Sequence, residues 1–168
     1  TTVGKNVVAL EIDGSFDDCQ SLVKTAFQDE LLQRNRPLTS ANSINIGRWL
    51  PQSIYYAWAV AQAKQPVDFV IPSGNFGNAA AGVLAQKMGV PAASFLAAVN
   101  TNASMQDYLD SGAYTPMSSI PTISNAMDVG DPSNRPRLEW LYNGSVSDMQ
   151  RQFSVVSVDE ESTKQTMR

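Results

Sequence analysis

The run Val67-Asp68-Phe69-Val70-Ile71-Pro72-Ser73-Gly74-Asn75-Phe76-Gly77-Asn78, followed by Ala79-Ala80-Ala81-Gly82, decides the fold of this chain. A short apolar segment enters a turn rich in glycine and asparagine, and the turn opens directly into a helix-like segment. Backbone N–H groups freed in such a turn, together with the positive end of the helix macrodipole, form a seat for a phosphate. The sequence therefore predicts a phosphorylated ligand at the C-terminal end of a buried strand.

This turn does not match the common nucleotide-binding motifs. A tight strand-to-helix connection also needs glycines for its own sake, and the turn alone leaves both interpretations open. No Gly-Lys-Ser/Thr follows, so it is not a P-loop. The spacing of Gly74, Gly77 and Gly82 does not fit a dinucleotide fingerprint, and the next strand ends in Asn100 rather than in an acid that could hold a ribose. What remains is a compact cup for a single phosphate monoester.

The composition excludes several function classes. The 168 residues are 43% hydrophobic and 17% charged, as expected of an ordinary globular domain. The net charge of -4 argues against nucleic acid as a partner. The absence of histidine excludes Ser-His-Asp and Cys-His catalysis and His-dependent metal sites. Because Cys19 is the lone cysteine, no intrachain disulfide can form, and we expect a cytoplasmic location.

The most hydrophobic long stretch, residues 44–63, is interrupted by Asn45, Arg48, Pro51 and Gln52. We interpret it as a core helix and expect no membrane partner. The chain opens with Thr1-Thr2 and an apolar strand at 7–12, and it closes within a helix that starts near residue 162. These ends predict a piece of a larger protein.

Hydrophobic spacing predicts an α/β fold. Helices are expected from Asp17 or Asp18 to residue 36, at 50–61, 77–88, 105–109, 137–142 and 146–153, and from residue 162, with Leu50, Ile54, Trp58 and Ala61 on the buried stripe of the second. Strands are expected at 7–12, 67–71, 94–99 and 155–158. Strands that are apolar throughout and separated by helices indicate a mostly parallel sheet with helices on both faces.

The segment Asn42-Ser43-Ile44-Asn45-Ile46-Gly47-Arg48 gathers amides, a hydroxyl and a guanidinium before a helix. Ordinary N-capping by Asn42 or Ser43 explains it without any ligand. The functional interpretation uses Arg48 or the asparagine side chains to hold an anionic group of a substrate.

Three other clusters are better explained structurally. Asp17 and Asp18 suit a helix N-terminus more than a catalytic carboxylate pair. Cys19, with no histidine available, is interpreted as an inert thiol. The segment around Asp128 and Asp131 is interpreted as a structured turn. Metal binding by the two carboxylates is only a weak alternative, and no metal site is expected.

Four motifs in order resemble the central part of threonine synthases, pyridoxal-phosphate (PLP) enzymes with a tryptophan-synthase-β-like fold of type II. They are Asp13-Gly14-Ser15-Phe16-Asp17-Asp18-Cys19-Gln20, the Asn42–Arg48 segment with Pro51-Gln52, Pro72-Ser73-Gly74-Asn75-Phe76-Gly77-Asn78, and Ser124-Asn125-Ala126-Met127-Asp128-Val129. Together they span most of the 168 residues.

The resemblance implies conversion of O-phospho-L-homoserine and water to L-threonine and phosphate, with PLP as electron sink. It implies that backbone N–H groups of Gly74, Asn75, Phe76, Gly77 and Asn78 hold the cofactor phosphate. Asn42, Ser43 and Arg48 then line or support the active-site cleft.

The resemblance also implies a domain assignment and a missing group. Residues 1–168 form a single α/β fragment, mainly of the larger cofactor-binding domain, and about residues 1–40 come from the junction with the smaller domain. The family's Schiff-base lysine lies upstream of these motifs, so no catalytic residue is assigned here and the chain by itself is expected to be inactive. Its expected partners are a small phosphorylated amino acid and the remainder of its own polypeptide.

Three alternatives stay open at this point. One is another type II PLP lyase or dehydratase, and a second is a threonine synthase-like protein with a changed substrate. The third is a non-catalytic module that binds a phosphorylated metabolite or a protein partner.

Overall fold

The structure is a computed structural model that describes residues 4–167. Its packing separates two compact units, residues 1–38 and residues 39–168. The assignment of about residues 1–40 to a domain junction stays a prediction. Every element of the candidate site belongs to the second unit.

The first unit contains α1 (Phe16–Gln28) and α2 (Glu30–Asn35). A single helix was expected here, but it breaks at Asp29, whose side chain accepts from Leu32 N and starts α2. The N-cap of α1 is Ser15 rather than Asp17 or Asp18, and Asp18 completes a capping box with it. Cys19 is a free, half-buried thiol.

The prediction of a strand at residues 7–12 is wrong. Gly4 and Val7 form one isolated antiparallel bridge, and the residues after it have no regular structure. Val8 and Leu10 are exposed, because no strand among residues 4–167 pairs with this apolar run.

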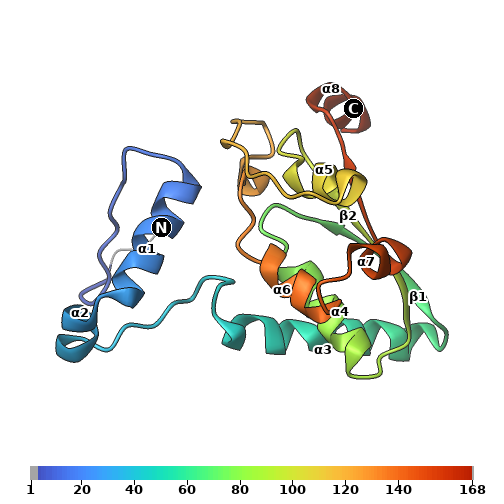
Figure 1. The fold of residues 1–168 in the computed structure, drawn as a ribbon, viewed down its shortest axis with the longest axis horizontal. Coiled ribbons are helices and arrows are strands. Elements are labelled where there is room, and N and C mark those ends of the chain that lie inside the picture. The colour runs from blue at the N-terminus through green and yellow to red at the C-terminus, as the bar shows by residue number, and fades with distance from the viewer. Residues whose placement is uncertain (1–3, 168) are drawn as a thin grey trace. The chain divides into compact units, whose positions relative to one another are not determined.

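The second unit holds a parallel three-stranded sheet with the order β1-β2-β3. Its elements in chain order are α3 (Ile46–Ala63), β1 (Val67–Pro72), α4 (Gly77–Lys87), β2 (Ala92–Val99), α5 (Ser104–Ser111), η1 (Asn125–Met127), α6 (Arg135–Leu141), α7 (Val146–Gln152), β3 (Phe153–Ser157) and α8 (Glu160–Thr166). Figure 1 shows α3 passing beside α4, which packs in turn against α6 and the sheet. The predicted α/β class and parallel sheet are confirmed.

Helix α4 lies at the centre of the core because its residues are small. Ala79, Ala80, Ala81, Val83 and Ala85 are completely buried. A Cβ at Gly82 would lie 2.6 Å from the Tyr56 ring. That ring belongs to an aromatic cluster with Phe69 and Phe95, at centroid distances of 4.7 and 5.9 Å. The close approach of α3 fixes the N-terminus of α4 beside the end of β1.

The buried face of α3 differs from the predicted one. Trp49, Ser53, Tyr56 and Val60 are buried, whereas the expected stripe of Leu50, Ile54, Trp58 and Ala61 is exposed. Pro51 lies in the second turn of the helix. The sheet is likewise less covered than predicted, since Val70 of β1 is 69% exposed. Within the described residues, α3 and β1 thus leave apolar surface open.

Among residues 4–167, no helix is long and apolar enough to cross a membrane.

Candidate functional site

The glycine turn joins the C-terminal end of β1 to α4. Ser73 N donates to Ala98 O at 2.8 Å and extends the sheet ladder by one residue past β1. Its hydroxyl donates to Ile71 O at 3.1 Å, and the residue is buried. The turn therefore starts from a fixed point at the edge where the parallel strands end, which is where ligands bind in open α/β sheets.

The N–H groups of the turn are unengaged. Within the part of the chain that the structure describes, the backbone N–H groups of Gly74, Asn75, Phe76, Gly77 and Asn78 donate to no protein acceptor. Phe76, the N-cap of α4, has a left-handed backbone with φ 58° and no side-chain cap bond. A non-glycine residue in this region is strained, and such strain gathers at ligand clamps. No acidic side chain lies in the first turn of α4 to satisfy these donors or repel an anion.

Two glycines let other segments close around the turn. A Cβ on Gly74 would lie 2.6 Å from the Met127 Cα atom, and one on Gly77 would lie 2.7 Å from Ser43 Cβ. The turn is therefore in close contact with the Met127 backbone at Gly74 and with Ser43, in the loop before α3, at Gly77. Glycine is required here by close approach, because neither residue has a positive φ.

The structure brings Ser43 into contact with the turn. The Ser43 hydroxyl accepts from Asn75 Nδ2 at 3.0 Å. Asn75 Oδ1 in turn accepts from Ser133 N at 2.6 Å and from the Ser133 hydroxyl at 2.9 Å. The Asn75 side chain thus joins the glycine turn to the loop before α3 and to the segment before α6, while the Asn75 backbone N–H has no acceptor among the described residues.

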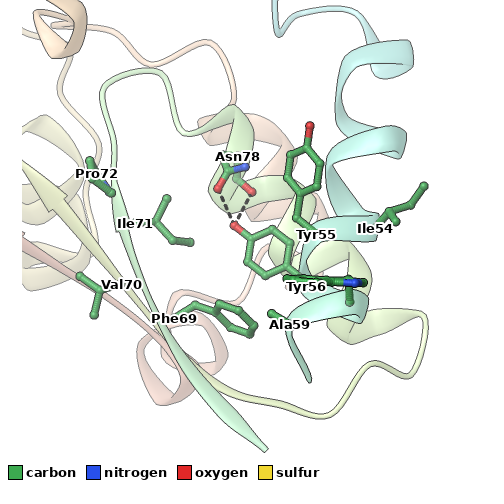
Figure 2. Close-up of a pocket in the computed structure, with 10 residues that line it drawn as sticks. Ile54, Tyr55, Tyr56, Ala59, Phe69, Val70, Ile71, Pro72 and Asn78 are labelled. Carbon is green, nitrogen blue, oxygen red and sulfur yellow. Dashed lines mark hydrogen bonds between the residues drawn. The ribbon is translucent and has the colours of Figure 1, made fainter. Parts of the chain in front are cut away.

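Asn78 is held by α3. The Tyr56 hydroxyl donates to Asn78 Oδ1 at 2.7 Å and lies 3.0 Å from Asn78 O. Figure 2 draws both contacts as dashed lines. Asn78 Nδ2 donates to Gln52 Oε1 at 3.1 Å. Burial raises the pKa of Tyr56, so its hydroxyl stays a neutral donor. The Asn78 side chain and carbonyl oxygen are therefore committed to α3, and of its polar groups only the backbone N–H has no acceptor among the described residues.

Asn42 and Arg48 make local contacts. Asn42 Oδ1 accepts from Ile44 N at 3.1 Å, and the N-cap of α3 is Asn45 rather than Asn42 or Ser43. The exposed Arg48 guanidinium donates to the carbonyl oxygen of Ala41. Within residues 4–167, Arg48 has no carboxylate partner. It borders a pocket of about 290 Å³ lined by Gly47, Arg48, Pro51, Gln52 and Tyr55.

Sequence reasoning missed Asn134 and Arg137. Asn134 Nδ2 donates to Asn75 O at 2.8 Å and to the Ser43 hydroxyl at 3.1 Å. Arg137 donates to the carbonyl oxygens of Ser43 and Ile44, and its guanidinium lies over the Trp49 ring at 4.9 Å. An asparagine before an Arg-Pro pair is typical of a helix start, so its sequence gave no sign of this contact.

A second polar network fixes the wall that faces Gly74. Asp128 Oδ1 accepts from Asn100 Nδ2 at 2.7 Å and from the Thr122 hydroxyl at 2.7 Å. Asn102 Nδ2 donates to Ile120 O at 2.9 Å. Asp128 is thus part of a structured turn, as expected. Of the residues searched, no group of acids, histidines and cysteines could hold a metal ion.

A large apolar groove lies between α3 and β1 (Figure 2). It has a volume of about 570 Å³ and is lined by Ile54, Tyr55, Tyr56, Trp58, Ala59, Phe69, Val70, Ile71, Pro72 and Asn78. The polar groups of this lining include the Asn78 amide and the two tyrosine hydroxyls, and none of its side chains is charged. The sequence did not predict this groove, because Ile54 and Trp58, which line it, were expected to be buried in the core.

Comparison with known proteins gives a consistent answer. The chain is 45% identical over 171 residues to the threonine synthase of Escherichia coli, with 99% of this chain and 40% of that protein covered. It superposes on the crystal structure of threonine synthase from Escherichia coli with a TM-score of 0.92 and 44% identity, again over 99% of this chain and 40% of that one. This chain is homologous to part of threonine synthase.

A PLP-bound threonine synthase from Brucella melitensis matches with a TM-score of 0.77 and 32% identity, over 94% of this chain and 40% of that one. No protein-family model matches the sequence. The resemblance to threonine synthases is confirmed. The chain spans about 40% of the length of the threonine synthases it matches.

Proposed function

We propose that this chain carries the cofactor-phosphate seat and part of the substrate cleft of a PLP-dependent threonine synthase. The reaction is the conversion of O-phospho-L-homoserine and water to L-threonine and phosphate. The observation that carries the proposal is the set of five backbone N–H groups from Gly74 to Asn78, beside the N-terminus of α4, that have no acceptor within residues 4–167. The 45% identity to a threonine synthase supports it.

The residues of the turn fit a phosphate monoester. Its oxygens are hydrogen-bond acceptors, and the turn offers donors with no competing acid. The glycines at 74 and 77 let the walls approach without a side chain filling the cup. PLP, when bound, supplies an electron sink for carbanion chemistry. The residues of this chain fix its phosphate end and so set where the ring lies.

Ser43 and Arg48 are proposed to face the anionic substrate. Ser43 adjoins the glycine turn directly, and Asn42 shapes the same loop by bonding to Ile44 N. Arg48 carries a positive charge without a carboxylate partner among the described residues, and its pocket opens toward solvent. A guanidinium of this kind is suited to a phosphate group.

The reactive lysine is proposed to come from outside these 168 residues. Lys64 caps the far end of α3, and Lys87 lies in the last turn of α4 over the Tyr142 ring. Lys164 pairs with Glu160 in α8. None of these three lies at the N-terminus of α4. The chain treated with PLP and borohydride should therefore show no single lysine that is modified in preference to the others, and a stoichiometric adduct at one lysine would contradict this.

The apolar groove between α3 and β1 is proposed to be covered by the remainder of the polypeptide. The free edge of β1 offers a row of backbone groups for another strand, and Ile54, Trp58 and Val70 offer apolar surface beside it. The acidic net charge and the lone cysteine support an enzyme of the cytoplasm with no nucleic-acid partner.

An assay of the whole polypeptide tests the function. Loaded with PLP, it should release phosphate from O-phospho-L-homoserine and form one threonine per phosphate. Arg48→Ala should weaken apparent substrate binding more than Arg48→Lys does. Consumption of serine or threonine without phosphate release would instead favour another lyase or dehydratase.

A further inference from the structure

We infer that Asn134 and Arg137 are positioning residues that hold the phosphate seat in its binding geometry. This inference rests on the proposed function of the glycine turn. Both residues lie outside the four motifs, in a turn-rich segment and the first turn of α6.

The side chain of Asn134 is diverted from the role that its position favours. Asn134 is the N-cap of α6, where an asparagine normally accepts a hydrogen bond from the helix backbone. Here no side-chain cap bond forms, and the residue is completely buried. Its Nδ2 atom instead bridges Asn75 O and the Ser43 hydroxyl, while Oδ1 accepts from Arg137 Nη1 at 2.5 Å.

The contact with Asn75 sets the direction of an unengaged donor. The carbonyl of Asn75 and the N–H of Phe76 belong to one planar peptide unit and point in opposite directions. A donor that fixes the carbonyl on the Asn134 side therefore fixes the Phe76 N–H on the other side. Phe76 has a strained left-handed backbone, which persists only where its surroundings hold it. Asn134 provides that restraint.

Arg137 orients Asn134 and adds charge. Because its guanidinium donates to Asn134 Oδ1, the amide of Asn134 must turn its NH₂ group toward Asn75 and Ser43. The same guanidinium donates to the carbonyl oxygens of Ser43 and Ile44 and so holds the adjoining loop. Among the described residues it forms no ion pair, so its positive charge behind the seat is not neutralised.

The test is a ¹H–¹⁵N NMR titration of the 168-residue chain with inorganic phosphate and, separately, with pyridoxal phosphate. Asn134→Asp keeps the shape of the side chain but cannot donate to Asn75 O. We expect affinity to fall about tenfold or more, as for other residues that orient binding groups, and the shift of the Phe76 amide to be lost. Arg137→Lys retains the charge but not the fork of donors, and it should weaken binding less than Arg137→Gln.

Gln86→Ala is the matched control. Gln86 lies near the other end of α4 and donates to Ala92 O at 2.8 Å, so its loss destabilises the chain without touching the seat. It should leave the affinity unchanged. If Asn134→Asp does not fold, Ser43→Ala removes the acceptor that Asn75 and Asn134 share, and it should lower the affinity for phosphate.

Two results are distinguishable. A folded Asn134→Asp variant that binds phosphate as the unmodified chain does, with the Phe76 shift intact, would overturn the positioning role. Failure of the unmodified chain to bind either ligand would instead overturn the phosphate seat itself.

Discussion

Asn134 Nδ2 donates a hydrogen bond of 2.8 Å to the carbonyl oxygen of Asn75, across 59 residues of sequence. The contact joins the turn after β1 to the start of α6. Since the Ser43 hydroxyl accepts from both side chains, the loop before α3 is held at the same point. The candidate site is thus a meeting of three turns, and its geometry depends on long-range contacts rather than on the glycine turn alone.

The close approach at Gly74 makes a first prediction. In Gly74→Ala the new Cβ would meet the Met127 backbone at 2.6 Å, and backbone cannot rotate away as a side chain can. We expect the free energy of unfolding, measured with urea, to fall by about 1–3 kcal/mol, together with a loss of phosphate binding. Gly4→Ala is the control, since its nearest neighbour lies at an ordinary 3.5 Å. Full stability and binding in Gly74→Ala would show that the wall does not press on the turn.

Tyr55 and Tyr56 give a matched pair on α3. Tyr56→Phe removes a buried hydroxyl that donates to Asn78, and it should lower the free energy of unfolding by about 1–2 kcal/mol. Tyr55 is 62% exposed, and its hydroxyl has no partner among the described residues. Tyr55→Phe should therefore change stability by less than about 0.5 kcal/mol. Equal changes in the free energy of unfolding for the two variants would show that the Tyr56 hydroxyl does not stabilise the fold through Asn78.

Trp49 and Trp58 test which face of α3 is buried. Trp49 is 4% exposed and packs under the Arg137 guanidinium, so Trp49→Ala should destabilise the chain by about 3 kcal/mol or more. Trp58 is 66% exposed, and Trp58→Ala should change stability by less than about 0.5 kcal/mol. Emission of Trp58 should also be red-shifted relative to that of Trp49. The reverse order of the two unfolding energies would restore the face predicted from the sequence.

The capping box of α1 makes a prediction about pH. The Ser15 side chain, and then its backbone N–H, lower the pKa of Asp18 below 3.8 by hydrogen-bonding to the carboxylate. A lowered folded pKa means that this contribution to α1 is present above pH 3.8 and is lost as the pH falls through the folded value. In a carboxylate NMR titration, Ser15→Ala should raise the pKa of Asp18 towards 3.8. An unchanged value would show that the hydroxyl does not stabilise the charge.

Much of the second unit could be predicted from local sequence. The apolar run at 67–71, the glycine turn and the small residues of α4 each match one element with nearly correct bounds. Periodicity also located β2, α6 and α7 within a few residues. These elements are set by short-range pattern, so the parallel sheet followed from them.

The features that the sequence analysis predicted wrongly or missed all depend on contacts between residues far apart in the chain. The run at 7–12 is apolar, but no strand in the described part of the chain lies beside it. Helix α3 has apolar residues on two faces, so periodicity could not show which face is buried. Asn134 and Arg137 act through contacts with residues about 60 and 93 positions away, for which no local pattern exists. The motifs located the seat, but only the fold could show what holds it.

The most direct test of the phosphate seat compares pyridoxal phosphate with pyridoxal in an NMR titration of the unmodified chain. We expect pyridoxal phosphate to shift the amide resonances of Gly74, Asn75, Phe76, Gly77 and Asn78 until the site is saturated, and inorganic phosphate to displace it. Pyridoxal, which lacks the phosphate, should leave the chemical shifts of these amides unchanged. Equal shifts with both compounds, or no shift at these five residues, would show that the glycine turn does not hold the phosphate.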